Sequence, residues 1–123
     1  MENEKTIVSR AIPLTSASAI VALAALAQES RLAVFRLLVQ AGSQGMAATK
    51  IAEALAIAPS SLSFHLKELA HADLVTASKA GRSIIYAANY AGMNGLLVFL
   101  TDNCCAGAPC CVSEPHLLKE TTT

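Results

Sequence analysis

The chain of 123 residues carries nine Lys and Arg side chains against nine Asp and Glu side chains, so its formal net charge is zero. This length supports one domain with its own core rather than two. A hydrophobic fraction of 54% with 15% charged residues excludes an ordinary disordered chain, and the balanced charge argues against an indiscriminate polyanion binder. The apolar excess on so short a chain leaves room for a partner subunit.

The start of the chain has some features of a targeting segment, because Lys5 and Arg10 precede the apolar residues 19–27. Glu2 and Glu4 offset that basic charge, and nine residues are too few to cross a bilayer core of about 30 Å. No later stretch is long enough either. We therefore expect a soluble, cytoplasmic protein without a membrane segment.

Two helices are predicted in the first third of the chain. Apolar side chains surround nearly the whole of the first, over residues 16–27, and a helix of this kind is normally buried on more than one side. In so short a chain a second copy supplies that burial most easily. The second helix is predicted over residues 30–41, with Ser30 as its N-cap and a glycine-containing loop after it.

A short helix and a longer helix follow in close order. The first is predicted over residues 49–56, with Thr49 as its cap, and the second over about residues 60–72. Pro59 separates them, since proline breaks a helix interior but is favoured in a first turn. Leucines at helical spacing predict the buried stripe of the longer helix: Leu62, Leu66 and Leu69. A short helix, a tight turn and a longer helix form a helix-turn-helix.

After residue 73 the apolar pattern changes from helical to alternating. Residues 74–78 and 83–87 are predicted to form a β-hairpin whose basic, glycine-containing tip is residues 79–82. Asn89 is predicted to cap a last helix over residues 90–101, which again has a broad apolar surface. We expect a winged helix-turn-helix and dimerisation domain over residues 1–103 and a flexible, cysteine-rich tail over residues 104–123.

The predicted fold is therefore mainly α with a β-hairpin wing. The second helix of such a unit fits the major groove of DNA, about 12 Å wide, and the wing touches the backbone or minor groove beside it. Hydroxyl and imidazole groups suit base edges or phosphates, and cationic groups suit phosphates. The candidate DNA contacts on the helix are Ser60, Ser61, Ser63, Phe64, His65 and Lys67, and those at the wing tip are Lys79 and Arg82.

Each of these features also has an ordinary structural explanation, since serines cap helices and a basic hairpin tip aids solubility. Their order and spacing together favour a protein that binds double-stranded DNA. The charge distribution agrees, because residues 31–83 contain six basic and three acidic side chains, a local excess of three positive charges. The two ends of the chain carry the compensating negative charge.

Several segments resemble arsenical-resistance repressors of the ArsR/SmtB type. They are residues 51–55 (IAEAL), 62–69 (LSFHLKEL), 73–75 (DLV) and 81–86 (GRSIIY). The resemblance covers about residues 23–105 and implies a homodimer, joined through its first and last helices, that releases operator DNA on binding a metal or metalloid. Phe64 departs from the family pattern, which has Arg or Gln at this position in many members, so the operator sequence is not carried over.

Four cysteines lie within eight residues: Cys104, Cys105, Cys110 and Cys111. Two vicinal pairs differ from the separated Cys-x-x-Cys pairs of a structural zinc site. Neighbouring residues diverge by about 100° on a helix, so a vicinal pair converges on one ion only where the helix has frayed. Thiolates select soft ions, and arsenite favours three sulfur ligands. The cluster therefore predicts a site for a soft ion, and the resemblance implies that this ion is the inducer and is arsenite, with antimonite, methylated arsenite or another soft ion as the alternatives.

The resemblance implies more about this site. Similar repressors carry an Asn-Cys-Cys motif here, matched by Asn103-Cys104-Cys105, with a third thiolate from further along the tail, either Cys110 or Cys111. The family's Cys-x-Cys site on the recognition helix and its zinc site on the last helix are missing from this sequence. Whether one tail or two tails form each site stays open.

Three alternatives were considered. A thiol redox-sensing repressor would share the fold and lose DNA on oxidation. A small cysteine enzyme would need a phosphate-cradling loop, a catalytic triad or a Cys-x-x-Cys before a helix, and the sequence has none of these. A metal-storage protein would bind ions without binding DNA. We expect a non-enzymatic repressor without an organic cofactor.

Overall fold

The computed structural model describes residues 14–102. The four cysteines and the predicted domain boundary at residue 103 lie outside the described residues. The elements are, in chain order, α2 (Ser16–Leu26), α3 (Glu29–Ala41), β1 (Met46–Ala47), α4 (Ala48–Leu55), α5 (Pro59–His71), β2 (Val75–Ala80), β3 (Ser83–Ala88) and α6 (Tyr90–Thr101). The predicted winged helix-turn-helix is confirmed, and each predicted helix boundary lies within one residue of the observed one.

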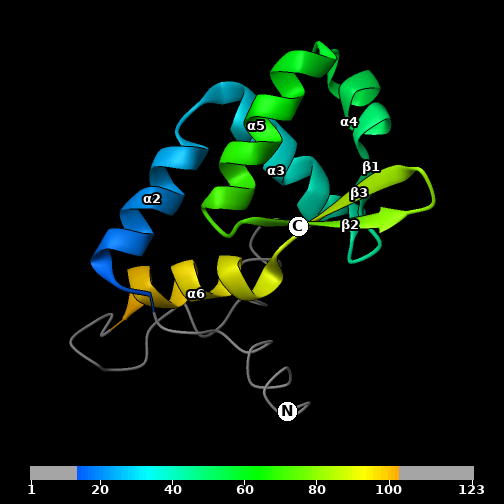
Figure 1. The fold of residues 1–123 in the computed structure, drawn as a ribbon. Helices are drawn as coiled ribbons and strands as arrows, with labels where there is room; N and C mark the ends of the chain where they lie inside the picture. Colours follow the sequence, from blue (N-terminus) through cyan, green and yellow to red (C-terminus); the bar gives the residue numbers. More distant parts are fainter. Residues whose placement is uncertain (1–13, 103–123) are drawn as a thin grey trace, which may run out of the picture.

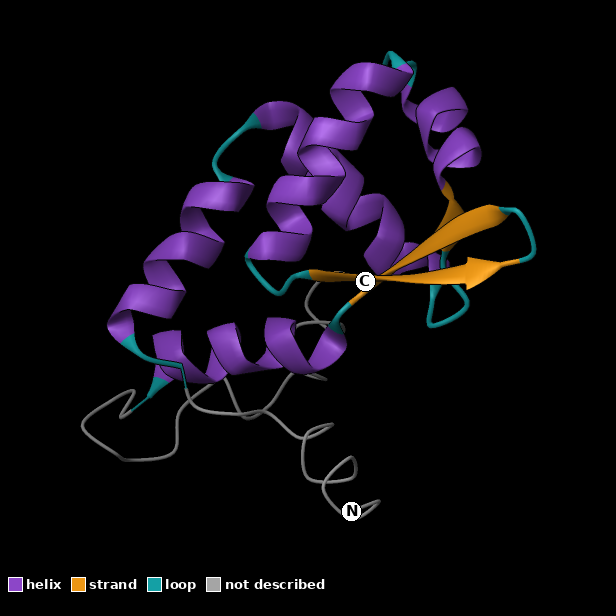
Figure 2. Ribbon diagram, viewed as in Figure 1, coloured by secondary structure: helices purple, strands orange, loops and turns teal. Residues whose placement is uncertain are grey.

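The strands lie on one side of the fold, below α4 (Figure 2). α4 and α5 form the helix-turn-helix, and α3 packs against both of them. The β2–β3 hairpin projects as a wing on the side away from α2 (Figure 1). α6 returns beneath the other helices and contacts α2. The terminal helices are therefore neighbours, although most of the domain separates them in the sequence.

The core lies where α3, α4, α5 and the first residues of the wing meet. Val34 and Leu38 of α3 and Ile51 of α4 are fully buried. The predicted leucine stripe of α5, Leu62, Leu66 and Leu69, is buried as expected. Among the described residues no polar or charged residue is buried. The core is thus apolar and fixes α5 from one side only, leaving its opposite side free.

The sheet is antiparallel and has the strand order β1-β3-β2. The sequence did not predict β1, whose two residues Met46 and Ala47 pair with Tyr86 and Ile85. In the hairpin, Lys79 pairs with Ile84 and Ala80 pairs with Ser83. The placement of Lys79 in the tip was therefore wrong, because the strands pair further than the alternation suggested and leave a turn of only Gly81 and Arg82. Gly81 has a φ of 64°, which suits the first position of such a two-residue turn.

Helix caps were predicted with mixed success. The Asn89 side chain accepts a hydrogen bond from Gly92 N at 3.2 Å and caps α6, as expected. Ser30 was the wrong residue for α3, because the Gln28 side chain accepts from Arg31 N at 2.9 Å and the helix begins one residue before Ser30. Thr49 was also wrong, since α4 begins directly after β1 and its N-cap, Ala47, makes no side-chain cap.

The turn of the helix-turn-helix is closed by a residue in an unusual conformation. Ala56 ends α4 in the left-handed region, with φ 54° and ψ 46°, a region that costs an L-residue with a Cβ roughly 1–2 kcal/mol. Its N–H and that of Ile57 bond back to Glu53 O and Ala52 O. Pro59 then occupies the first turn of α5, as predicted. The strained turn fixes the direction in which α5 leaves α4.

Within residues 14–102, no single helix is long and apolar enough to cross a membrane. Only α2 and α3 taken together reach the necessary length and hydropathy, and they are bent by 100° relative to each other.

Candidate DNA-binding surface

The predicted DNA contacts of α5 fall into two groups in the structure. Ser60, Ser61, Ser63, Phe64 and Lys67 are exposed, as expected for a helix that reads DNA. His65 is only half-buried rather than fully exposed, and its Nδ1 atom is buried without a hydrogen-bond partner among the described residues. Its ring meets that of Phe64 edge-on, with centroids 6.0 Å apart. His65 therefore belongs partly to the packing of α5, and the other five side chains form the available surface.

The middle of this exposed surface is Phe64. Successive residues of a helix are turned by about 100°, so Phe64 lies about 200° around the axis from both Leu62 and Leu66, on the side opposite to the core. Ser60 and Lys67 lie four residues before and three residues after it, on the same side. α5 thus presents an aromatic ring between a hydroxyl and an ammonium group.

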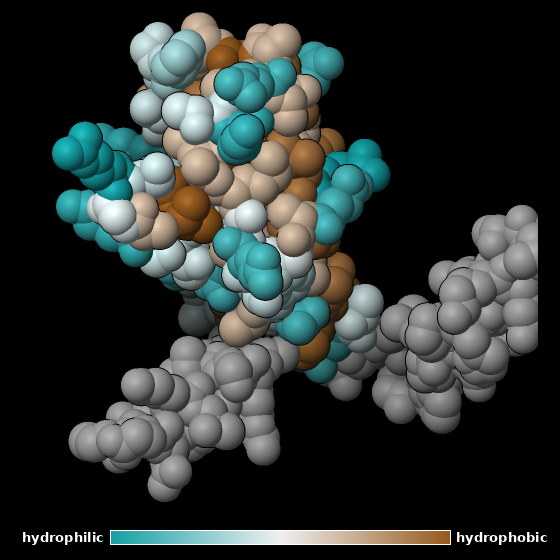
Figure 3. Space-filling model, turned by 90° about the vertical axis from the view of Figure 1, so that its right-hand side faces the viewer, coloured by the Kyte–Doolittle hydropathy of each residue, from teal (hydrophilic) through white to brown (hydrophobic). Residues whose placement is uncertain are grey.

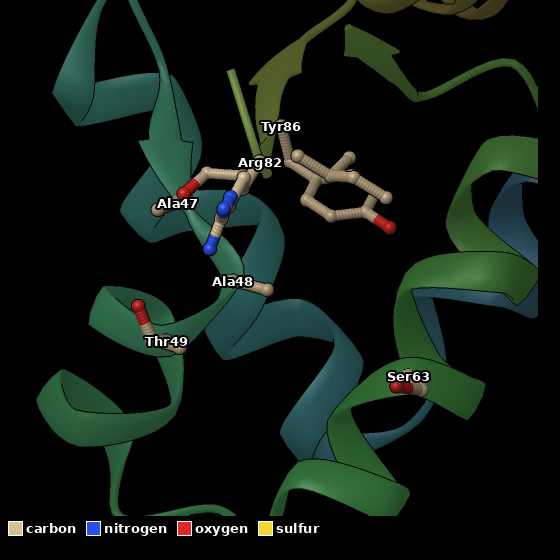
Figure 4. Close-up of a pocket in the computed structure, with 8 residues that line it drawn as sticks. Ala47, Ala48, Thr49, Ser63, Arg82 and Tyr86 are labelled. Atoms are coloured by element: carbon tan, nitrogen blue, oxygen red, sulfur yellow. The ribbon is translucent and has the colours of Figure 1, made fainter. Parts of the chain in front are cut away.

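A hollow of about 310 Å³ lies between the start of α4, α5 and the wing. Arg82 of the wing turn extends its guanidinium along Ala47, the last residue of β1, and Ala48, the first residue of α4, and Ser63 of α5 stands across from it (Figure 4). Thr49 and Tyr86 also line the hollow. Sequence reasoning missed both, because only folding brings β3 and the uncapped start of α4 beside α5.

The hollow has the groups that attract an anion. Its lining contains a guanidinium, the hydroxyls of Thr49, Ser63, Ser83 and Tyr86, and no carboxylate. The first N–H groups of α4 are not capped by a side chain, and such groups favour negative charge. On the face that carries α4 and the wing, hydrophilic groups project around small apolar areas (Figure 3). This mixture is typical of a surface that meets DNA rather than of a protein core.

A second surface, formed by α2 and α6, has a different character. α2 directs its small residues Ala19, Ala22 and Ala25 into the domain. It exposes its larger side chains Ile20, Val21 and Leu23, and α6 likewise exposes Leu97, Val98 and Leu100. We call these six residues the terminal-helix face. An ordinary surface helix shows the reverse arrangement.

The start of α6 is bonded to the DNA-reading part of the domain. The Asn89 side chain donates a hydrogen bond to Asp73 O at 2.8 Å, just after α5, and the Tyr90 hydroxyl donates to Val39 O of α3, also at 2.8 Å. A Cβ placed on Gly92 would stand 2.2 Å from Asp73 O, so only glycine permits this approach. These contacts tie the start of α6 to α3 and to the segment that follows α5.

A helix-turn-helix with a wing and an exposed, partly cationic recognition helix defines a DNA-binding transcriptional regulator. Residues 26–76 match a family model described as a helix-turn-helix domain, and no curated protein matches the chain.

Solved structures extend this match. An ArsR-like transcriptional regulator from Rhodococcus sp. RHA1 is 28% identical, with 68% of this chain and 76% of that chain covered and a TM-score of 0.62. HlyU from Vibrio cholerae is 30% identical over 69% of this chain and 92% of its own, with a TM-score of 0.56, and another structure is described as its reduced form. A homodimeric winged helix-turn-helix DNA-binding domain from Mycobacterium bovis, a possible ArsR-family regulator, is 26% identical, with 81% and 82% covered and a TM-score of 0.56. The chain belongs to the ArsR family of winged helix-turn-helix transcriptional regulators.

Proposed function

We propose that this regulator is a homodimeric repressor that binds operator DNA in its free form and releases it when arsenite, or a related soft ion, is bound by the C-terminal cysteines. The observation that carries the proposal is the terminal-helix face, because the helix that precedes the cysteines is also part of the surface best suited to dimerisation.

The dimer is supported by what α2 and α6 expose. Ile20 of α2 is 64% exposed, although Ala19 and Ala22 of the same helix are buried, and Leu97 of α6 is 51% exposed. Contiguous apolar surface of this kind marks an interaction site. A homodimer is the occupant we propose, because one similar domain is described as homodimeric and a two-fold interface pairs the same surface of both copies.

DNA binding by this dimer follows the geometry of two recognition helices. Two copies of α5 enter successive major grooves when they lie about 34 Å apart, one turn of DNA. The hollow beside each helix then receives a backbone phosphate, held by Arg82 and the start of α4, and Lys67 contacts the backbone from α5. Residues 31–83 carry a net excess of only three positive charges. Tight binding therefore requires both domains of the dimer to contact the DNA at the same time.

The inducer site is proposed from the chemistry of its donors. Cys104 and Cys105 supply two sulfurs and either Cys110 or Cys111 supplies the third. Each thiol that reacts with arsenous acid forms an As–S bond, breaks an As–O bond and releases one water, so three thiols replace all three hydroxyl groups. Thiolates prefer soft ions to Mg²⁺ or Ca²⁺, which makes this donor set selective.

Release is proposed to result from a change in the position of α6. This helix ends at Thr101, so the first two ligands follow it within four residues. When the thiolates gather around one atom, the end of α6 is rearranged at the terminal-helix face, where the two copies meet. The hydrogen bonds of Asn89 and Tyr90 then carry this displacement to the end of α5 and to α3. DNA must weaken arsenite binding by the same factor, with a coupling typically of about 1–3 kcal/mol.

A mobility-shift titration tests the proposal. Arsenite is expected to release operator DNA from the wild type. Cys104→Ser and Cys105→Ser are expected to retain DNA binding and lose the response. One of Cys110→Ser and Cys111→Ser should also lose it, and the other serves as the matched control because it removes a thiol that is not a ligand. Release of DNA from all four variants at the wild-type arsenite concentration contradicts the mechanism.

A thiol redox-sensing repressor is the second candidate, and it is favoured by one observation, that a structure of the similar HlyU is described as reduced. Four cysteines within eight residues also allow disulfide formation. In this case peroxide alone releases DNA and a thiol reductant restores binding, without metalloid. The two candidates are separated by repeating the titration with arsenite under strictly reducing conditions, where only the first predicts release.

A further inference from the structure

One large apolar side chain on α5 is not explained by the core or by the terminal-helix face. Phe64 is 55% exposed in the middle of the recognition helix, whereas Leu62, Leu66 and Leu69 of the same helix are buried. An exposed aromatic ring costs free energy in water. Its position, about 200° from the nearest buried leucines, points it away from the core of the domain.

The surroundings of Phe64 indicate what covers it. Ser60, Ser61 and Ser63 are exposed around it and Lys67 lies one turn further along, so the ring stands within a polar and cationic surface rather than in an apolar patch. A protein partner would be expected to meet a broader apolar area. A major groove meets these polar groups with phosphates and base edges, and it displays only one apolar group, the C5-methyl of thymine.

We propose that Phe64 reads thymine in the operator by packing its ring against the C5-methyl group in the major groove. This inference rests on the proposed DNA-binding function and specifies how the recognition helix selects its sequence. The serines and Lys67 position the helix by contacts to phosphates and base edges, and Phe64 favours a thymine at one position of each half-site. Because the ring has no hydrogen-bonding group, it discriminates by contact with the methyl group alone.

The expected size of the effect follows from the burial of one methyl group. Removing that methyl from its contact with Phe64 weakens binding about fourfold in one half-site, and roughly 16-fold when both half-sites of a symmetric operator are changed. The effect at one half-site is smaller than that expected for the loss of a bidentate hydrogen bond to a base.

The experiment uses the full-length protein and a synthetic operator duplex that the protein itself selects from random-sequence DNA. Each thymine is replaced in turn by deoxyuridine, which lacks only the C5-methyl group, and the dissociation constant is measured by fluorescence anisotropy at fixed salt. The same series is measured with Phe64→Ala. Ser63→Ala is the matched control, because it also removes an exposed side chain from α5 but leaves the ring. Thermal unfolding of both variants confirms that the exposed positions do not alter the fold.

The proposal expects one thymine per half-site at which deoxyuridine weakens the wild type and Ser63→Ala about fourfold but leaves Phe64→Ala unchanged. An identical deoxyuridine profile for the wild type and Phe64→Ala overturns it. If that profile is identical and arsenite still releases the duplex, the thymine contact is wrong and the repressor function stands. If the protein selects no duplex at all, both are wrong.

Discussion

Placing a charge on the terminal-helix face is expected to separate the dimer without unfolding the domain. Ile20 is 64% exposed, so about two thirds of its side chain remains to be covered by a partner. Full burial of an isoleucine contributes about 1.5–3 kcal/mol, and covering the exposed part therefore contributes about 1–2 kcal/mol. A symmetric interface contains the residue twice, which gives about 2–4 kcal/mol per dimer.

Ile20→Asp removes this contribution and adds the cost of burying a carboxylate. We expect the dimer dissociation constant to rise on the order of 100-fold or more, and DNA affinity to fall with it because single domains bind one half-site. Sedimentation equilibrium over a range of concentrations measures the first effect, and anisotropy measures the second.

The control is Ile84→Asp, which places the same charge on a wing residue that is 43% exposed. It should leave the dimer constant unchanged and weaken only DNA binding, since Ile84 lines the hollow beside Arg82. A dimer constant for Ile20→Asp equal to that of the wild type would refute the assignment of the terminal-helix face to the dimer.

Three further substitutions test individual contacts. Ala56→Gly should raise the free energy of unfolding, measured by urea denaturation, by about 1 kcal/mol. Relief of the left-handed strain exceeds the entropy that glycine adds to the unfolded chain. A decrease would show that the turn is not strained. Tyr90→Phe should lower the free energy of unfolding by about 0.5–1.5 kcal/mol, because the hydrogen bond to Val39 O is lost. A decrease no larger than that of the exposed control Thr76→Ala would argue against that hydrogen bond. Arg82→Ala should weaken binding to all duplexes alike and reduce the slope of log affinity against log salt by about two per dimer; an unchanged slope would exclude a phosphate contact.

The recognition helix shows how far local sequence determines this protein. Three leucines at spacings of four and three residues, preceded by Pro59, are enough to place α5 and to name its buried side. The exposed side then follows by elimination, and its candidates Ser60, Ser61, Ser63, Phe64 and Lys67 are exposed as predicted. Helical periodicity is a local property, so it needs no knowledge of the remaining fold.

Contacts between distant segments account for what the sequence missed. β1 consists of two residues with no pattern of their own, and only β3 makes them a strand. Lys79 lies in β2 rather than in the turn because the pairing of β2 with β3 extends past it to Ala80. His65 is a different case, because it lies three residues after Leu62 and four before Leu69, on the flank of the buried leucine stripe, so its half-burial follows from helical spacing itself.

The first helix, α2, shows most clearly which features follow from the sequence and which require the tertiary structure. The sequence alone showed that residues 16–27 are apolar on nearly every side and hence that two surfaces must be covered, but a helix without a polar face does not indicate which side meets its own domain. The tertiary structure decided this, because close packing against α3 and α5 admits only the small side chains of Ala19, Ala22 and Ala25. Ile20, Val21 and Leu23 are consequently left outward, where a second copy can bury them.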